Sequence, residues 1–426
     1  MRSTSPCIAL LALATALAAG ASAQDAEPEG FRFRVTGLLD LRLVAADEER
    51  SFLDAGLGKL RYGGEGDGTG RETLFRLAQA SVVLRASVGE ALSARVQLGV
   101  DSDYRKGSGL NGADVTEAFL AYAPRLSDTL GLGLRAGILI PPISLENDGR
   151  AWTATRTVTP SAINSWIGEE VRATGLELTL RAFLQKSDLA ATVAVFGWND
   201  PGGSLVAWRG WALQDRQTGF TDRLPFATEP AFRPNRDFPV QTPWVAPFRE
   251  LDGRAGWYAG ASWEVPEKLE VRLMRYDNGG DRLTVERGQY SWETRFYAAG
   301  VRVALANGLE LLAQGVSGRT KMGPGPVVNV PFEALFGLAT VVTGLHRFSL
   351  RYDVFRNEDR NPTAAGETFG EEGSAWTAAW LFGAFPRATL ALEVVSVRSE
   401  RPSRRELGLA PGVRETIGTL GLRLKL

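Results

Sequence analysis

One thiol and one imidazole occur among the 426 residues of this chain, so few side chains could act as a nucleophile, a general base or a soft metal ligand. They are Cys7 and His346. A structural zinc site needs several such ligands, and a nucleophilic hydroxyl or thiol needs a positioned base. His346 lies at the expected start of a strand beside a short turn, where a structural role is favoured. We therefore expect no catalytic residue, no metal site and no cofactor.

Charge is the other chemistry that the sequence offers, and residues 141–171 concentrate it. This segment opens with Pro141-Pro142 and carries Trp152, Ile163 and Trp166, which could anchor it against an inner wall. Charges that line a pore select the ions that enter it. We predict that the segment folds inward beside basic residues of the neighbouring extended segments. The predicted constriction comprises Arg95, Arg135, Glu146, Arg150, Arg156, Glu169 and Arg181.

The overall charge argues against a polyanionic partner. The chain has 48 Lys and Arg against 49 Asp and Glu, a formal net charge of -1. A nucleic-acid-binding protein carries a basic excess, so we expect no nucleic-acid partner. Glycine is abundant, with 48 copies and no collagen period, which favours tight turns and an all-β fold.

The first 23 residues read as a cleaved signal peptide. Arg2 precedes the apolar run CIALLALATALAAG, and Ala21-Ser22-Ala23 has the small-x-small pattern of a cleavage site. We expect residues 1–23 to be removed and residues 24–426 to form one exported domain.

Alternation with period two recurs along the rest of the chain. Leu176, Leu178 and Leu180 alternate with Glu177 and Thr179, for example, which is the pattern of a strand with one apolar face. Such segments predict about 16 strands, an even number, at residues 31–45, 73–88, 91–103, 114–122, 129–140, 172–185, 189–199, 255–264, 269–277, 292–303, 309–319, 332–342, 346–356, 374–383, 387–397 and 415–426.

The connections between these segments fall into two kinds. Those after even-numbered strands are short, such as Gly89-Glu90, while those after odd-numbered strands run from roughly ten to more than fifty residues. Short turns at one end and long loops at the other are typical of a transmembrane antiparallel β-barrel. A soluble two-domain sandwich also alternates, but the chain has no composition break or linker. We predict a single barrel in the bacterial outer membrane.

The polar face of the predicted strands would line the barrel interior. Its basic members outnumber its acidic ones, which favours weak anion preference, although the charges could instead pair across neighbouring strands. The expected inward cations are Arg32, Arg34, Arg42, Arg85, Arg95, Arg135, Arg181, Arg272, Arg302, Arg347, Arg351, Arg387, Arg423 and Lys425, and the expected inward anions are Asp40, Asp101, Glu117, Glu177, Glu270, Glu310, Glu333, Asp353 and Glu393.

The stretches LRAGILIPPISLEN and TRTVTPSAINSWIGEEVRATGLEL resemble the phosphate-selective porin O/P family, on Arg135, Gly137, Pro141-Pro142, Leu145-Glu146, Arg156 and Pro160. The resemblance implies a trimeric 16-stranded barrel, an inward-folded third loop and a cationic row that conducts anions. Lysine is scarce here, Glu169-Glu170 are acidic, and the chain ends in Leu426 where most barrels have Phe. Phosphate specificity therefore does not carry over.

The leading functional hypothesis is a porin for passive diffusion of small anionic or neutral hydrophilic solutes, with outer-membrane lipids and lipopolysaccharide around it. A barrel enzyme and a non-channel structural or adhesin barrel are the alternatives. The connection at 200–254 holds Trp208, Trp211 and Trp244 beside several arginines. It could stack flat solutes such as sugars, or it could pack on itself as a lid.

Overall fold

The computed structural model describes residues 30–426 except 65–69, 102–111, 228, 235, 326 and 362–368. The predicted signal peptide lies outside the described residues. Among the described helices, none is both long and apolar enough to cross a bilayer.

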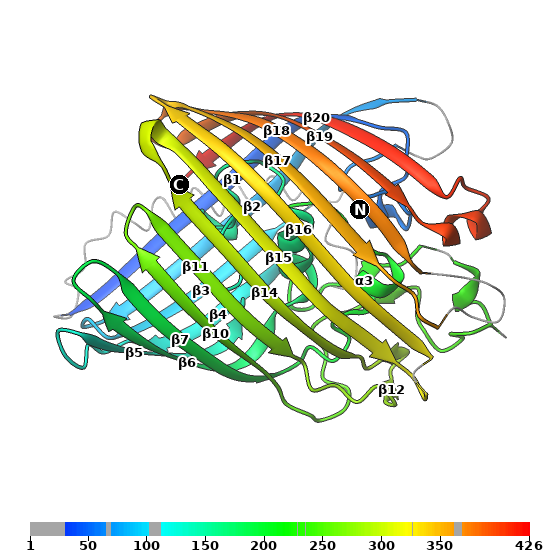
Figure 1. The fold of residues 1–426 in the computed structure, drawn as a ribbon, viewed down its shortest axis with the longest axis horizontal. Coiled ribbons are helices and arrows are strands. Elements are labelled where there is room, and N and C mark those ends of the chain that lie inside the picture. Colours follow the sequence, from blue (N-terminus) through cyan, green and yellow to red (C-terminus); the bar gives the residue numbers. More distant parts are fainter. Residues whose placement is uncertain are drawn as a thin grey trace, which may run out of the picture.

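Sixteen strands close into one antiparallel barrel, in which each strand pairs with its neighbours in chain order and β1 pairs with β20 (Figure 1). This confirms the predicted fold class and strand number. The strands of the barrel are β1 (Phe31–Ala46), β2 (Glu72–Val88), β3 (Leu92–Val100), β4 (Ala113–Tyr122), β5 (Leu130–Leu139), β6 (Ala173–Phe183), β7 (Asp188–Gly197), β10 (Gly256–Val265), β11 (Leu269–Asp277), β14 (Glu293–Ala304), β15 (Leu309–Met322), β16 (Val328–Thr343), β17 (His346–Asn357), β18 (Glu371–Phe385), β19 (Ala388–Glu400) and β20 (Gly412–Lys425).

The register of the ladder separates an apolar outer face from a polar inner one. Leu134 lies opposite Leu178 across β5 and β6, and the next pair along the ladder is Arg135 opposite Glu177. Side chains of successive residues in a strand point to opposite faces, so the leucines and the ion pair cannot share a face. Leu180 is 53% exposed on the outer face. The predicted inward assignment of Arg135 therefore agrees with the structure.

One strand reverses the predicted assignment. Glu333 of β16 is exposed on the outer face, whereas Phe332 and Phe336 are buried inside the barrel. The prediction that Glu333 faces inward is wrong, because β16 is apolar on both faces and its alternation does not identify the outer side. Leu335 supplies the apolar outer contact beside Glu333.

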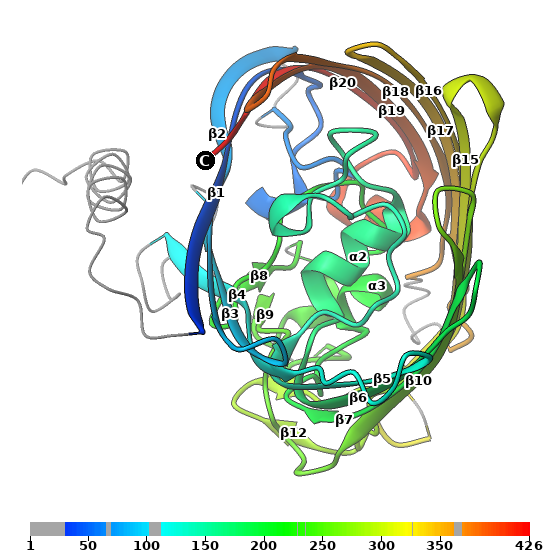
Figure 2. The ribbon, with the colours of Figure 1, turned by 90° about the vertical axis from the view of Figure 1, so that its left-hand side faces the viewer.

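The two ends of the barrel differ as expected. The connections after the even-numbered wall strands are short turns, and most of the others are long loops. Residues 323–327 are an exception, because β15 and β16 extend further than predicted and leave only five residues between them. Two loops fill the interior: residues 140–172, with helix α2 (Ala162–Glu170), and residues 198–255, with helix α3 (Ser204–Trp208) (Figure 2).

Candidate pore interior

The loop at 140–172 folds into the barrel, as predicted, and helix α2 is its innermost element. The side chain of Ser161 caps this helix by accepting a hydrogen bond from the Asn164 backbone N–H at 3.3 Å. An N-cap serine satisfies one of the free amides at a helix start. All nine residues of α2 are buried, so the helix contacts the wall and the second loop on all sides.

Aromatic packing fixes α2 against one side of the wall. Trp166 contacts Phe296 of β14 and Phe332 of β16 edge to face, with ring centroids 5.2 and 5.1 Å apart. Trp211, from the second loop, packs on the same indole at 5.8 Å. Edge-to-face pairs of this kind stabilise beyond the area they bury. The inward apolar face of β16 therefore holds the helix in place.

A buried ion-pair network attaches the start of this loop to β17. The Arg351 guanidinium donates to Glu146 of the loop at 2.7 Å and to Asp353 of its own strand at 2.7 Å. It also donates to the backbone oxygens of Thr159 at 2.7 Å and Pro160 at 3.0 Å. All three charged groups are almost fully buried. We call Arg351, Glu146 and Asp353 the β17 latch.

A second set of buried charges joins the two loops to each other. Glu169 of α2 accepts two hydrogen bonds from Arg209, at 2.8 and 2.6 Å. Glu170 accepts from the Trp166 indole N–H at 2.6 Å and from the Leu205 amide at 2.9 Å. Burial raises the pKa of the Glu170 carboxyl to about 7. These contacts close the space between the two helices.

The loop at 198–255 is held by the wall and by its own aromatic side chains. Asp215 accepts from Arg42 of β1 and from Arg61 at 3.0 Å. Although burial alone would raise the pKa of Asp215, the two guanidiniums hold it well below its usual range. Trp208 packs edge to face on Trp292 at 4.7 Å and on Phe226 at 5.4 Å. Self-packing, one of the two predictions for this loop, is therefore what the structure has.

One carboxylate cluster in the described residues has the spacing of a metal site. Oxygens of Asp200, Glu250 and Asp252 lie within 4.8 Å of one another. Backbone amides already donate to them, from Trp198 to Glu250 at 3.0 Å and from Leu251 to Asp200. The cluster is thus stabilised by the protein itself and carries no metal assignment. Burial raises the pKa of Asp200 to about 7.

A cavity of about 610 Å³ opens inside the barrel toward the short turns, between the wall and Pro142 of the loop; we call it the first vestibule. Its charged lining contains more arginine than glutamate. The charged residues are Arg125, Arg135, Arg181 and Arg272, against Glu177, Glu264 and Glu270.

An arginine row crosses the inner wall beside this vestibule. Arg34 of β1 lies directly opposite Arg85 of β2, and Arg85 lies directly opposite Arg95 of β3. Side chains at directly opposed positions share a face, and like charges there repel each other. Arg95 is paired with Glu117 at 2.7 Å. Within the described part of the chain, Arg34 and Arg85 form no ion pair.

A smaller cavity of about 440 Å³ lies on the opposite side of the loop, and we call it the second vestibule. Arg150, Arg347, Arg423 and Lys425 line it, with Asp148. Arg150 donates to the Gly37 carbonyl at 3.1 Å, at the seam between β1 and β20. Both vestibules therefore carry a basic excess.

The structure divides the seven predicted constriction residues into three groups. Arg95, Arg135 and Arg181 lie on the inner wall of β3, β5 and β6, where Arg135 pairs with Glu177 at 2.7 Å. Arg150 and Arg156 belong to the loop on its other side, and Arg156 pairs with Asp148 at 2.9 Å and with Glu310 of β15. The third group, Glu146 and Glu169, is fully buried in ion pairs.

Arg156 and Arg135 are therefore not neighbours, contrary to the expected arrangement. The loop crosses the barrel toward β15, and strand alternation carries no signal for that direction. The Arg34–Arg85–Arg95 row was not singled out from the sequence, although the turn at Gly89-Glu90 fixes the β2–β3 register. Counting back from that turn places Arg85 opposite Arg95.

No family model and no curated protein matches this chain. Solved structures do. The outer-membrane channel DcaP of Acinetobacter baumannii superposes with a TM-score of 0.55 at 9% identity, over 94% of this chain and 99% of that chain. The anion-selective porin from Comamonas acidovorans gives 0.54 at 12%, over 93% and 100%, and Salmonella typhi OmpF gives 0.51 at 12%, over 93% and 98%. At these identities the likeness shows a shared fold, and the resemblance to the phosphate-selective O/P family stays a prediction.

Proposed function

We propose that the protein is a porin of the bacterial outer membrane, through which small hydrophilic solutes diffuse passively with weak anion preference. The observation that carries the proposal is the Arg34–Arg85–Arg95 row on the inner wall, beside a vestibule with four arginines and three glutamates. Two of the three arginines of the row lack a carboxylate partner among the described residues, so their field acts on solutes.

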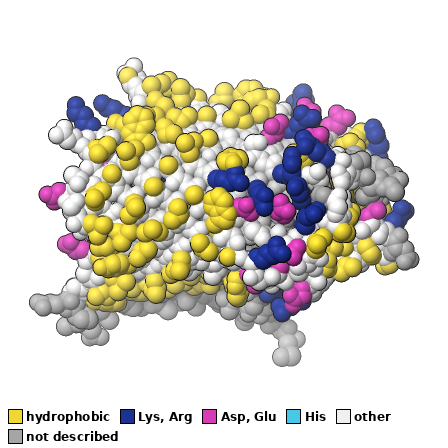
Figure 3. Space-filling view, turned by 60° about the horizontal axis from the view of Figure 1, so that its bottom comes forward, with side chains coloured by type: hydrophobic (Ala, Val, Ile, Leu, Met, Phe, Trp, Pro, Cys, Tyr) yellow, Lys and Arg dark blue, Asp and Glu magenta, His cyan; other side chains and the backbone are white. Residues whose placement is uncertain are grey.

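The outer surface supports a place in the membrane. Large apolar side chains such as Leu134, Leu180 and Leu350 are exposed on the outer wall. Figure 3 shows hydrophobic side chains over much of the face that it views. In water such an extended apolar surface would drive aggregation, whereas lipid solvates it. A closed barrel also leaves no unpaired strand edge in the bilayer. Outer-membrane lipids and lipopolysaccharide are then the surrounding partners, and we propose a homotrimer, as the family resemblance implies.

The proposed preference for anions rests on the excess of arginine along the inner wall and on the enclosed space that these arginines face. Directly opposed arginines repel one another, and a passing anion relieves that repulsion. A water-filled space with low-dielectric walls strengthens the field of such charges. Glu117 and Glu177 neutralise Arg95 and Arg135 in part, so we propose a weak preference and not a strict one.

The reversal potential of purified protein in a planar phosphatidylcholine bilayer, under a salt gradient, tests this proposal. Arg85→Ala and Arg181→Ala should shift it toward cations. Arg275→Ala is the matched control, since Arg275 lies on the outer face beside Trp257 and Tyr297 and should leave it unchanged. Unaltered selectivity in Arg85→Ala would refute the role of the row, and unaltered selectivity in Arg181→Ala would refute the role of the first vestibule. Absence of discrete current steps would refute the channel itself.

A non-channel structural barrel is the second candidate, because the two loops pack the interior so tightly. All of α2 is buried, and so are the five residues of α3. The same bilayer recording separates the two, since only a pore conducts. An enzyme is disfavoured, because the Nδ1 atom of His346, the one imidazole of the chain, accepts the Trp380 indole N–H at 3.1 Å.

A further inference from the structure

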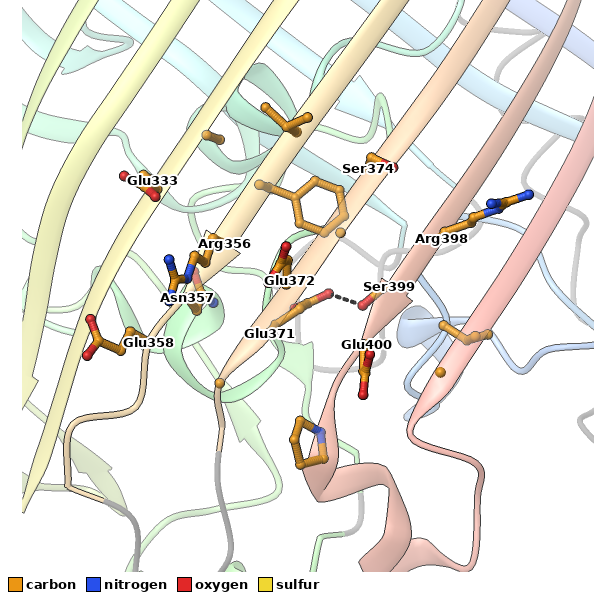
Figure 4. A pocket seen from close by; sticks show the side chains of 18 of the residues that line it. Glu333, Arg356, Asn357, Glu358, Glu371, Glu372, Ser374, Arg398, Ser399 and Glu400 are labelled. Atoms are coloured by element: carbon orange, nitrogen blue, oxygen red, sulfur yellow. Dashed lines mark hydrogen bonds between the residues drawn. The ribbon is translucent and has the colours of Figure 1, made fainter.

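A groove of about 1420 Å³ lies on the outer wall of the barrel, across β16 to β20 near the long loops. Most of its charged lining comes from outward-facing residues at the loop ends of five neighbouring strands. Figure 4 shows Arg356 of β17, Glu372 of β18, and Arg398 and Glu400 of β19 around it. Arg414 of β20 completes the lining on that side. These residues face away from the interior and take no part in the proposed pore.

Like charges stand directly opposite each other in this groove. Arg398 pairs in register with Arg414. Glu372 pairs in register with Glu400 on one side and with Arg356 on the other. The four side chains of the two like-charged pairs are exposed, and none forms an ion pair with a described residue. Directly opposed like charges destabilise a sheet. An anion bound between the two guanidiniums would remove that repulsion and satisfy several donors at once.

One outward arginine near the loop end of another strand pair has a carboxylate partner and serves as a comparison. Arg295 of β14 forms an ion pair with Asp277 of β11 at 2.8 Å. The two residues are directly opposed in register. Arg295 also lies directly opposite Arg319 of β15, so an opposed arginine pair occurs there as well. One member of that pair has a carboxylate partner, whereas neither Arg398 nor Arg414 has one among the described residues. The unpaired arrangement at Arg398 and Arg414 is consistent with a ligand that supplies the missing negative charge.

The groove begins where the apolar outer face ends. Tyr352 and Trp376 pack with ring centroids 4.4 Å apart on the outer face of β17 and β18. Tyrosine and tryptophan favour the boundary between acyl chains and headgroups. Leu350 and Leu392 are exposed on the turn side of this pair, while Arg356 and Arg398 lie on its loop side. The arginines thus stand at headgroup depth, directly above lipid-facing side chains.

We propose that Arg398 and Arg414 bind a phosphate group on the headgroup of an anionic outer-leaflet glycolipid, whose acyl chains run down past Tyr352 and Trp376. The inference rests on the proposed membrane location and is independent of conduction. The lining also holds six carboxylates against three arginines, among them Glu372 and Glu400 one step closer to the loops. They oppose an anion unless a divalent cation neutralises them. Binding should therefore strengthen when Mg²⁺ is added.

A second copy of this chain fits the groove less well. The centre of a stable protein interface is depleted of charge, whereas this groove has charged side chains on every strand it crosses. A phosphorylated headgroup matches both the charge of the arginine pair and the apolar surface beneath it. The occupant that the observations favour is therefore a lipid.

The test is lipid retention by the folded full-length protein in detergent, measured by native mass spectrometry. The probes are bisphosphorylated lipid A and phosphatidylcholine, each with and without Mg²⁺. The wild type should retain lipid A and not phosphatidylcholine. Arg398→Gln/Arg414→Gln should weaken retention about thirtyfold, since each arginine near an anionic surface contributes about a factor of five. Arg295→Gln is the matched control and should bind lipid A like the wild type.

Equal retention of lipid A by the double variant and the wild type would overturn the proposal, as would equal retention of both lipids by the wild type. Loss of oligomeric mass in the double variant with lipid retention unchanged would assign the groove to a contact between copies, which also overturns it. Conductance in phosphatidylcholine bilayers should be the same in both proteins. If neither conducts but their lipid retention differs, the channel proposal alone fails.

Discussion

The β17 latch gives the sharpest link between a buried side chain and conduction. Arg351→Ala removes the cation that Glu146 and Asp353 share, together with the donors to the backbone oxygens of Thr159 and Pro160. Both carboxylates then remain buried without a counter-charge. Breaking one partner of a buried ion pair costs about 3–5 kcal/mol. The strand ladder does not depend on this side chain, so we expect the barrel to form.

The cost should appear as release of the loop at 140–172. A loss of about 3 kcal/mol changes the ratio of docked to undocked loop by about two orders of magnitude. Undocking moves α2 away from Phe296 and Phe332 and widens the passage. We therefore expect higher single-channel conductance with frequent transitions between levels, and a lower free energy of unfolding in urea.

Single-channel recording and urea titration of the same preparation test this reasoning. Arg356→Ala is the control, because Arg356 lies on the same strand but faces outward, and it should change neither quantity. Arg351→Met/Glu146→Gln, which removes both charges, should recover part of the lost stability. Wild-type conductance and wild-type stability in Arg351→Ala would show that the latch does not hold the loop.

Three further predictions concern the wall, the lipid face and the second loop. The folded protein should migrate faster before heating than after it in detergent gels, because the closed ladder resists detergent; equal mobility would contradict the barrel. Leu180→Arg should lower the free energy of unfolding by about 2–4 kcal/mol, and Arg181→Leu by far less; similar losses in folding titrations would mean that the register is wrong. Burial raises the pKa of Asp200 to about 7, so the native state binds an extra proton between pH 4 and 7, and the free energy of unfolding should fall as pH rises through that range. Asp200→Asn should flatten this pH dependence and raise the free energy of unfolding by roughly 1–2 kcal/mol at pH 8 after solvent screening. An unchanged pH dependence of stability in this variant would contradict the raised pKa.

The strands were predictable because the two faces of most wall strands differ in polarity. An apolar outer face and a polar interior impose the alternation of Leu176, Glu177 and Leu178, and each short turn fixes the register of a hairpin. All sixteen strands lie within a few residues of their predicted positions. Where a second apolar surface exists inside, as around Trp166, the rule fails, and β16 was assigned the wrong way round.

The contacts of the loops could not be read in the same way. Alternation places Arg351 and Asp353 inside, but the partner of Arg351 is Glu146, which lies 205 residues away in the chain. Nothing local to either residue selects the other. Arg156 likewise meets Glu310 across 154 residues. A charge can be assigned to the inner face from sequence, whereas its counter-charge depends on the path of a loop.

The inner arginines therefore fall into two classes, which differ in burial: buried arginines hold a loop in place, and exposed arginines face the interior space. Arg351 is fully buried and its charge is neutralised by Glu146 and Asp353, so its field does not act on a solute. Arg34 and Arg85 are exposed to the interior and unpaired within the described residues, so in the proposed channel their field acts on the solute. Removing a buried arginine should change how wide the passage is, and removing an exposed one should change which ion enters. Conductance and reversal potential are separate measurements, so the two classes can be told apart in one set of recordings.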